Sequence, residues 1–546
     1  MPVSGNLSSD EQGVLKPDHD RVMKVEPGRT RGGTDEHKEA TLSRATPQTL
    51  PSSTAGALLD SLLILPPHPS APTASRWRRF LESEDIVDSL KAWFGERQFE
   101  TRQQLLRELN RQIGQIDRLL NQQLNVILHH PQFQKLESGW RGLMYLVEKA
   151  WREDDADQPS VKIRVLNASW KDLQRDFSNA LEFDQSELFR KVYEQEFGTA
   201  GGEPFGVVVA NYELDASNSS CDSVSNLSQV AAAAFCPFII NASPRLFGLD
   251  DFIELERRLE HEKTFGGLEH LRWQGVRRKE DARFLAITLP NVLMRLPYSD
   301  SSHRVDGFQF REEVASPDRS RYLWGGAAFA LGGTLIRAFA NTGWLADIQG
   351  VHRDVDGGGL VTDLPVHCFT TERMGIAPRS STDVIITDEL EKRLSDLGFI
   401  SLCDCQDTEY SAFYSTPSMQ QPQKYDRQLA TTNARISAML HSMLCASRFA
   451  HYLKVISRDR IGGSTDPKQL ERFLQQWVSG YVTPDTDASP EVRARFPLRE
   501  ARVRVSATPG QAGVFEAVMQ LVPHYEIEGI STGIRLVARL AGVRHD

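Results

Sequence analysis

The sequence predicts a mixed α+β and α/β fold, and three observations along its 546 residues lead to that prediction. Apolar residues recur at helical spacing between residues 77 and 150. Short strand-like runs alternate with helix-like segments between about 160 and 410, which is typical of an α/β domain. A helical pattern followed by three alternating runs ends the chain. We therefore expect an N-terminal arm with helices, a central mixed-sheet α/β domain, and a C-terminal helix followed by strands.

The bulk composition excludes several classes of function. The net charge of −10 and the pI near 5.8 argue against nucleic acid as a partner. Six cysteines without repeated spacing fit a reducing compartment better than a disulfide framework. The first thirty residues hold no apolar stretch of the length that a secretory signal needs, and the most apolar windows are short or interrupted by charge or proline. We expect a cytoplasmic protein that does not insert into a membrane.

The N-terminal part, residues 1–76, is predicted to be a flexible arm. Residues 1–54 mix Ser, Thr, Pro, Gly and charge without apolar periodicity, so burial cannot offset the entropy lost on ordering. The run AGALLDSLLIL at 55–65 is an apolar island, and the Pro-rich PPHPSAPTAS after it separates it from the rest of the chain. An isolated apolar island predicts a partner.

Residues 77–150 are predicted to be helical. Apolar residues at spacings of one, three or four form a stripe that runs from Leu105 to Ile127. Pro131 disfavours helix at the residue before it, so we expect one long helix to end near HHP and a second helix to follow.

Residues 151–415 are predicted to form one large mixed sheet with its helices. The strand-like runs are VKIRVLN (161–167), FGVVVANY (205–212), ARFLAITL (282–289) and DVIITD (383–388). A helix opens near Asp388, with Thr387 as a plausible cap, acidic residues in its first turn and Gly398 after its end.

Residues 416–546 are predicted to hold a helix from about 427 to 457, whose apolar stripe we assign to the core, and three terminal strands. The strand pattern covers 498–506, 514–522 and 533–540, where apolar and charged residues alternate. A terminal sheet of this kind has edges, and edges must be covered.

No motif gives a convincing catalytic, cofactor-binding or metal site. GGAAFALGG (325–333) and VDGGGL (355–360) are glycine-rich, but neither has the Gly-Lys-Ser/Thr ending of a phosphate loop or the GxGxxG of a dinucleotide site. Cys403 and Cys405 form a CxC, yet no second Cys or His pair lies nearby to complete a zinc site. Catalytic groups far apart in sequence cannot be recognised from one chain, so a cytoplasmic α/β enzyme stays open as an alternative of a different class.

A colinear set of segments points to a known family. The clearest is ILHHPQFQKLESGWRGLMYLV (127–147), and the set continues through 205–214, 231–252, 283–298, 322–351, 383–402 and 433–459 to the terminal strands. These segments resemble the large sheath subunit of the bacterial type VI secretion system, the TssC or VipB family, also called ImpC/ImpD. The resemblance spans roughly residues 80 to 541, and the long front arm departs from it.

The resemblance implies a structural protein and not an enzyme. Members of this family pair with a small sheath subunit of the TssB/VipA type and polymerise helically around an inner tube of Hcp-like hexamers. Contraction that begins at the baseplate propels the tube, and it needs no catalytic residue, cofactor or metal in the subunit. A sheath-like protein of a phage-tail-derived injection device is the alternative within the same class.

The resemblance also implies which segments join subunits, since a strand lent to a neighbour through a flexible linker tolerates sliding. We expect residues near 55–76 and the terminal strands 498–506, 514–522 and 533–540 to form an interlocking intersubunit sheet, to which the small subunit supplies another strand. The candidate residues in it are Val503, Val505, Val518, Leu521, Ile534, Leu536 and Leu540.

The apolar island has two open interpretations. It is either a strand lent to a neighbouring subunit or a helical segment that a hexameric disassembly ATPase of the ClpV type grips. The leucines concerned are Leu58, Leu59, Leu62, Leu63 and Leu65.

Contact with the inner tube is expected to be polar and modest for each subunit, because a strong apolar interface would not release the tube. The candidate is the charged helix near 388, although a plain solvent-exposed face is the competing interpretation. Its charged residues are Asp388, Glu389, Glu391, Lys392, Arg393 and Asp396.

Overall fold

The computed structural model of the chain describes residues 78–541 with gaps and divides into two compact units, Met1–Gly95 and Glu96–Asp546. Within that range, the residues that are not described are 96, 98, 154–160, 200, 257–264, 300–306, 315–318, 352–355, 369–378, 461–466, 486–487, 508–513, 525, 528–529 and 532–533. The arm 1–76, including the apolar island 55–65 and its five leucines, lies outside the described residues.

The described part of the first unit contains helix α3 (Ile86–Phe94). Asp85 caps this helix by accepting a hydrogen bond from the Val87 amide. The rings of Phe80 and Trp93 pack 5.0 Å apart and hold the helix against the segment before it.

Two long helices open the second unit, as the sequence predicts. Helix α4 (Arg102–Leu128) begins at Thr101, whose hydroxyl accepts from the Gln104 amide, and ends at His129. Helix α5 (Pro131–Glu153) starts with the proline itself at its first position, where the missing N–H leaves no unpaired donor. The predicted break at HHP is therefore confirmed.

The centre of the second unit is a six-stranded mixed sheet, which confirms the predicted mixed α/β fold. Its strand order is β1-β2-β3-β7-β8-β6. Strands β1, β2, β3 and β7 are parallel to one another, β8 is antiparallel to β7, and β6 is antiparallel to β8. The bounds are β1 (Val208–Leu214), β2 (Phe238–Ala242), β3 (Leu285–Leu289), β6 (Leu360–Val361), β7 (Phe399–Asp404) and β8 (Ser411–Phe413).

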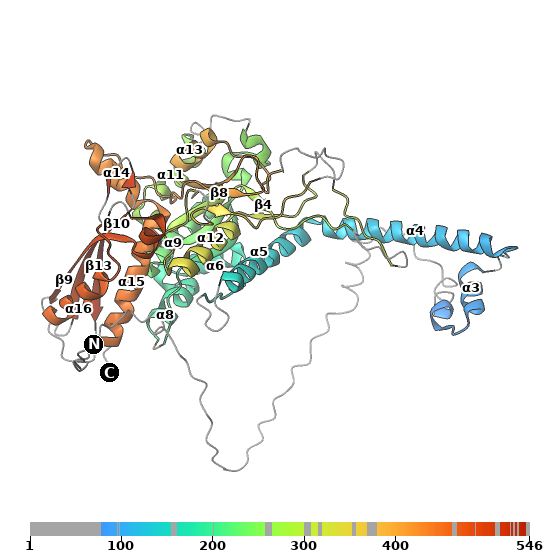
Figure 1. Ribbon diagram of the computed structural model, residues 1–546, viewed down its shortest axis with the longest axis horizontal. Helices are drawn as coiled ribbons and strands as arrows, with labels where there is room; N and C mark the ends of the chain where they lie inside the picture. The colour runs from blue at the N-terminus through green and yellow to red at the C-terminus, as the bar shows by residue number, and fades with distance from the viewer. Residues whose placement is uncertain are drawn as a thin grey trace, which may run out of the picture. The chain divides into compact units, whose positions relative to one another are not determined.

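Helices cover both faces of this sheet (Figure 1). Alternate residues of the strands point to opposite faces, so Ile240 packs toward α9 (Asn218–Ala234) and α11 (Leu271–Arg277), while Ile239 packs toward α12 (Ala328–Thr342). Because both faces are buried, the parallel strands read as continuous apolar runs.

Glycines allow α5 to pack closely on α12, the two helices that lie alongside each other in Figure 1. A Cβ at Gly142 of α5 would come within 2.5 Å of the Phe329 ring of α12. From the other side, a Cβ at Gly333 would come within 2.7 Å of Tyr145. Two glycines of the run 325–333, Gly332 and Gly333, therefore serve helix packing.

The strand predicted at 161–167 is not formed in the chain on its own. Residues 161–169 have no helix, turn, bend or strand pairing, and residues 162–167 are exposed. The residues have strand propensity, but strand formation needs a partner, and no described segment supplies one.

The strand predicted at 383–388 is also wrong. Val384 and Ile386 are buried as predicted for a core segment, but the backbone of this region is held by other bonds. The Thr382 hydroxyl donates to the Val384 carbonyl at 2.7 Å, and Thr387 caps α13 (Asp388–Asp396). These local side-chain bonds replace the ladder of a strand.

The single helix predicted over 427–457 is instead two helices, α14 (Gln428–Ser437) and α15 (Leu440–Arg460). Between them, the Leu440 amide donates to the Thr416 carbonyl at 2.8 Å and the Ser418 amide donates to the Ala438 carbonyl at 3.0 Å. These tertiary bonds interrupt the helix although the local sequence is compatible with it.

The three terminal strands are present, as predicted. They are β9 (Leu498–Ala507), β10 (Val514–Pro523) and β13 (Ile534–Ala541), and they form an antiparallel sheet of order β13-β10-β9. Helix α15 lies beside β13 and helix α16 (Pro467–Ser479) packs on β9 (Figure 1). The short strands β11 (Glu526–Ile527) and β12 (Ile530–Ser531) were not anticipated.

The remaining elements are short. They are α6 (Trp170–Asn179), α7 (Glu187–Phe189), α8 (Gln195–Phe197), α17 (Pro490–Arg495), β4 (Asn291–Leu293) and β5 (Trp324–Gly326).

Candidate functional site

The outer edge of β9 is covered by side chains of α16. The carboxamide of Gln475 donates to the Ala501 carbonyl at 3.0 Å and accepts from the Val503 amide at 2.8 Å. One turn earlier, Glu471 accepts from the Val505 amide at 2.8 Å. Residues 471 and 475 share one face of the helix, so their polar groups meet successive outward-facing backbone groups of the strand. The two side chains take the place of a neighbouring strand.

The start of β9 is covered as well. The Leu498 amide donates to the Tyr481 carbonyl at 3.3 Å, and the Leu498 carbonyl accepts from the Thr483 amide at 2.9 Å. At the opposite edge of the sheet, β13 pairs with β10 and, in the part of the chain that the structure describes, with no other strand. In the described part of the chain, the outer edge of β13 is paired with no strand, whereas side chains of α16 occupy the outer edge of β9.

The terminal-strand candidates divide between the two faces of this sheet. Val503, Val505 and Leu521 are buried against α15 and α16, whereas Val518 is half-buried on the other face. The register places Ile534, Leu536 and Leu540 opposite Leu521, Met519 and Phe515 of β10.

Helix α16 was missed by the sequence reasoning, although a signal exists. Its buried residues Leu470, Leu474 and Val478 are spaced by four, and Pro467 stands at its first position. Its role at the β9 edge depends on Glu471 and Gln475, which the sequence alone shows as ordinary polar residues on a helix.

Helix α13 presents only part of its charge to solvent. Asp388, Glu389, Lys392 and Asp396 are exposed. Glu389 pairs with Arg393 at 2.6 Å, and Arg435 lies 3.8 Å from Asp396. Of the six candidates, only Glu391 points inward, as described next.

Glu391 faces the body of the unit and not the solvent. It accepts a hydrogen bond from the Ser415 hydroxyl, and burial raises its pKa above the ordinary value. Five of the six charged candidates therefore remain on or near the exposed side of α13.

Helix α5 carries an exposed apolar stripe that the sequence reasoning assigned only to a helix. Leu136, Trp140, Met144, Val147 and Trp151 all lie on its outer side, with Trp140 65% and Trp151 80% exposed. Their spacing of three or four places them along one line of the helix, opposite the face that packs on α12. A line of large apolar side chains in water marks an interaction surface.

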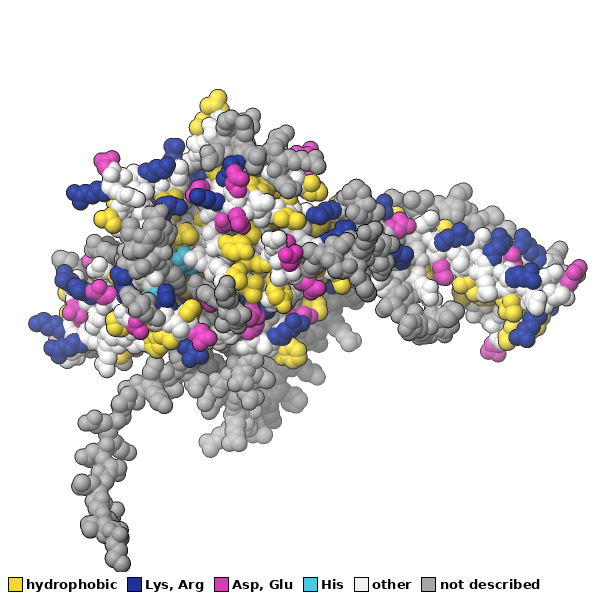
Figure 2. Space-filling view, turned by 45° about the horizontal axis from the view of Figure 1, so that its top comes forward, with side chains coloured by type: hydrophobic (Ala, Val, Ile, Leu, Met, Phe, Trp, Pro, Cys, Tyr) yellow, Lys and Arg dark blue, Asp and Glu magenta, His cyan; other side chains and the backbone are white. Residues whose placement is uncertain are grey.

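Apolar side chains also gather over the central body of the second unit on the face shown in Figure 2. Charged side chains of both signs are mixed among them, so this face shows no extended patch of a single charge. The charge distribution there fits protein contacts better than a nucleic-acid backbone.

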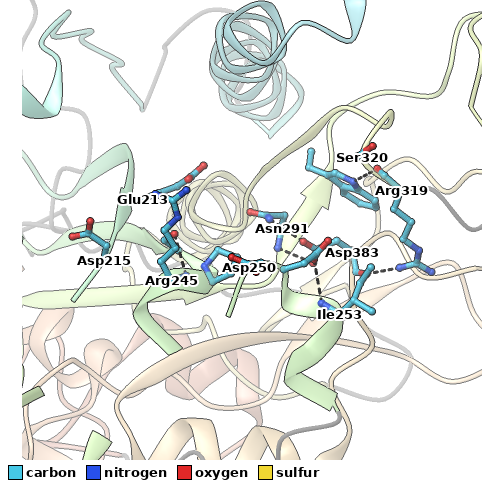
Figure 3. A pocket seen from close by; sticks show the side chains of 13 residues that line it. Glu213, Asp215, Arg245, Asp250, Ile253, Asn291, Arg319, Ser320 and Asp383 are labelled. Atoms are coloured by element: carbon cyan, nitrogen blue, oxygen red, sulfur yellow. Dashed lines mark hydrogen bonds between the residues drawn. The ribbon is translucent and has the colours of Figure 1, made fainter. Parts of the chain in front are cut away.

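A polar pocket of about 540 Å³ lies where the parallel strands β1, β2 and β3 end (Figure 3). Carboxyl ends of parallel strands are the usual place for ligands in α/β sheets. Asp383 is buried there and accepts hydrogen bonds from the Asn291 amide at 3.1 Å and the Asn291 side chain at 2.8 Å. Arg319 donates to the Asp383 carbonyl.

Burial raises the pKa of Asp383 to about 7, so its carboxyl exchanges a proton near neutrality. Glu213, Asp215 and Arg245 also line the pocket. The described lining includes no His, Cys or Lys, so it offers polar contacts and a titratable acid but no paired nucleophile and base.

The two cysteines of the CxC differ in position. Cys403 is buried in β7, where burial raises the pKa of its thiol, and Cys405 follows the end of the strand with its sulfur 3.9 Å from the Tyr414 hydroxyl. Over the described ranges, no three His, Cys, Asp or Glu side chains gather closely enough to hold a metal ion. None of the helices described here combines the length and apolarity that crossing a bilayer requires.

Comparisons with known proteins agree with one another over most of the chain. The family model "EvpB/VC_A0108, tail sheath N-terminal domain" (VipB) matches residues 110–420, and "EvpB/VC_A0108, tail sheath gpW/gp25-like domain" matches residues 429–540. The type VI secretion system sheath protein TssC1 of Pseudomonas aeruginosa is 37% identical over 435 residues, which cover 79% of this chain and 86% of the relative.

Among solved structures, a chain of the anti-feeding prophage baseplate matches with a TM-score of 0.32 and 11% identity over 71% of this chain and 80% of that chain. That similarity is too weak to identify a shared fold. The two family models cover most of α4, all of α5 and the central sheet, and the terminal strands up to residue 540. The chain therefore belongs to the family of type VI secretion system sheath proteins and is a structural subunit of that sheath.

Proposed function

We propose that the chain is the large subunit of a contractile sheath, which pairs with a small sheath subunit and polymerises helically around an inner tube. The observation that carries this proposal is the terminal sheet, in which α16 covers the β9 edge and leaves strand addition to the β13 edge. A strand supplied by a neighbour gains main-chain hydrogen bonds along its length, so it is a strong connection that needs no large apolar interface.

Contraction is a change of packing between the same subunits. The extended sheath stores free energy as a kinetically trapped lattice, and release at the baseplate converts it to the contracted lattice. Strand connections with flexible linkers keep neighbours attached while the rigid bodies slide. This stroke requires rigid subunits, for which the close packing of α5 on α12 is suited.

The finer partners follow from the family. An inner tube of Hcp-like hexamers is expected to meet the exposed charges of α13, among them Asp388 and Lys392. A ClpV-type disassembly ATPase or a neighbouring sheet is expected to take the island 55–65. The stripe on α5 is expected to be covered within the assembled sheath. The whole assembly is expected in the bacterial cytoplasm.

Two deletions test the proposal in cells that co-express the small sheath subunit. Deletion of residues 1–76 is expected to leave a heterodimer that forms no tubes in negative-stain microscopy. Deletion of residues 1–54 keeps the island 55–65 and serves as the matched control, which should still assemble. Normal tubes from the longer deletion would refute the assignment of the arm.

The two interpretations of the island give different results for a double variant. Leu59→Asp with Leu62→Asp should abolish tube formation if the island is a lent strand. It should abolish binding of the disassembly ATPase and leave tubes intact if the island is the gripped helix. A chain that forms discrete particles with the small subunit under all conditions would contradict the sheath proposal itself.

A further inference from the structure

The segment 161–167 is a β-prone stretch, and its residues 162–167 pair with no strand among the described residues. Its sequence VKIRVLN holds Val and Ile at alternate positions, and residues 161–169 run without a turn or a bend. Val165 is 67% exposed and Leu166 is 52% exposed. A β-prone, apolar and unbent segment in water is unusual in a monomeric protein, because it offers a template for another strand.

Its charged side chains hold this segment in place. Lys162 donates to Glu203 and Arg164 donates to Glu196, whose other oxygen accepts from the Glu203 amide at 2.8 Å. Arg164 also lies over the ring of Phe205, 5.4 Å from its centre. The segment is therefore fixed by anchors at two positions.

The anchors orient the apolar side chains. Successive residues of an extended chain point to opposite sides, so Ile163 and Val165 point away from the side on which Lys162 and Arg164 are tied. Both apolar side chains are exposed, in agreement with this geometry. The segment thus has one side on which Lys162 and Arg164 are paired with acidic residues and another side on which Ile163 and Val165 are exposed.

The backbone of residues 162–167 is also unpaired within the described part of the chain. Among the described residues, the amides and carbonyls of 162–167 make no hydrogen bond to another segment. The next carbonyl, that of Ala168, accepts from the Tyr212 hydroxyl at 2.7 Å. Tyr212 belongs to β1, the edge strand of the central sheet, which pairs only with β2 in the described structure. A tyrosine side chain, and not a strand ladder, connects the segment to the sheet edge.

We propose that residues 162–167 are a docking strand that pairs edge-on with an extended segment of the small sheath subunit. This inference rests on the proposed function and names a second place of strand addition, apart from the terminal sheet. The partner segment carries apolar residues at alternate positions, which pack on Ile163 and Val165, and its backbone bonds to the open groups of the segment.

A second copy of the same segment is the wrong occupant. When two copies of one strand pair antiparallel about a twofold axis, they use the same surface on both copies. Such a contact closes on itself as a dimer and does not propagate along a tube that has a direction. A different chain that is present once for each large subunit can pair with every docking strand along the tube.

Two variants at one position separate backbone pairing from apolar contact. Val165→Pro removes an amide donor and disfavours strand pairing, whereas Val165→Ser keeps the donor and removes the apolar side chain. In pull-down titrations with the small sheath subunit, Val165→Pro is expected to weaken binding at least tenfold and Val165→Ser clearly less. Both variants should unfold at the wild-type temperature, because Val165 is exposed and its backbone forms no hydrogen bond with a described residue.

Equal weakening by both variants would overturn backbone pairing, and no weakening by either would overturn the docking strand altogether. Hydrogen exchange gives an independent readout on the wild-type protein. The amides of 162–167 should exchange at least tenfold more slowly in the complex than in the full chain alone, and unchanged rates would contradict the proposal. If wild-type protein forms tubes and these results fail, only the docking strand is wrong; if wild-type protein forms no tubes, the sheath function is wrong.

Discussion

Replacing Gly142 by alanine tests the close contact between α5 and α12. The new methyl group would come within 2.5 Å of the Phe329 ring, whereas carbon atoms in contact normally lie about 3.5–4.0 Å apart. Overpacking of this kind costs about 1–3 kcal/mol, and the gain in helix propensity returns about 0.5–1 kcal/mol. We expect Gly142→Ala to lower the free energy of unfolding by about 1–2 kcal/mol.

Gly114 of α4 is the matched control, because no atom lies within 4 Å of its added Cβ. Gly114→Ala should raise stability by about 0.5–1 kcal/mol through helix propensity alone. Urea denaturation of the full chain, monitored by the circular dichroism signal of its helices, measures both changes in the free energy of unfolding. A midpoint that moves in the same direction for both variants would refute the assigned packing.

A double-mutant cycle locates the clash at the named ring. Phe329→Leu shortens the side chain that meets the new methyl group, so the variant with both changes should be less destabilised than the sum of the single changes. We expect a coupling of at least about 1 kcal/mol. Simple additivity would mean that the cost arises elsewhere in α5.

Three further predictions concern the covered edge, the pocket and the exposed stripe. Gln475→Ala should destabilise the terminal sheet by about 1–3 kcal/mol through two lost hydrogen bonds, measured by urea denaturation, whereas the exposed neighbour Gln476→Ala should have no effect. Because burial raises the pKa of Asp383 from 3.8 to about 7, the folded state holds a proton that the unfolded state releases, so this group lowers stability as the pH rises from about 4 to about 7. Asp383→Asn should remove a slope of up to about 1.4 kcal/mol per pH unit, and an unchanged difference between variant and wild type across that range would contradict the assignment. Trp140→Ser with Trp151→Ser should leave the stability of the chain unchanged but reduce tube formation with the small subunit, as counted by negative-stain microscopy.

The parts of the fold that local patterns specify could be predicted from the sequence. The break between α4 and α5 follows from a single proline, and α13 carries its own cap at Thr387 and its stop at Gly398, whose φ is +81°. The terminal strands follow from strict alternation over about ten residues each. In each case the signal lies within the element itself.

The errors arose where distant residues decide the structure. The helix break at Ala438 depends on hydrogen bonds with Thr416 and Ser418, which lie twenty or more positions earlier in the chain. Residues 161–167 have the composition of a strand, but a strand exists only with its partner. The covering of β9 by Gln475 was also beyond sequence reasoning, because two polar residues on a helix carry no mark of the strand that they meet.

The candidate residues show the same division. The buried positions Val503, Val505 and Leu521 could be expected from alternation, and the structure places them in one core with α15 and α16. The exposure of the apolar stripe on α5 could not be predicted. Large apolar residues at helical spacing indicate a buried face, but they do not show whether the residues that bury it belong to the same chain.

The covered edge of β9 also limits the number of edges at which the terminal sheet can be extended. A sheet with two bare margins could be extended on either side, and copies could then stack into sheets of indefinite width or branch. With Gln475 and Glu471 occupying one margin, the terminal sheet has a single margin, that of β13, that pairs with no strand or side chain among the described residues. Links between copies are therefore limited to a fixed number per subunit, which favours an ordered lattice over aggregation when many chains are crowded together.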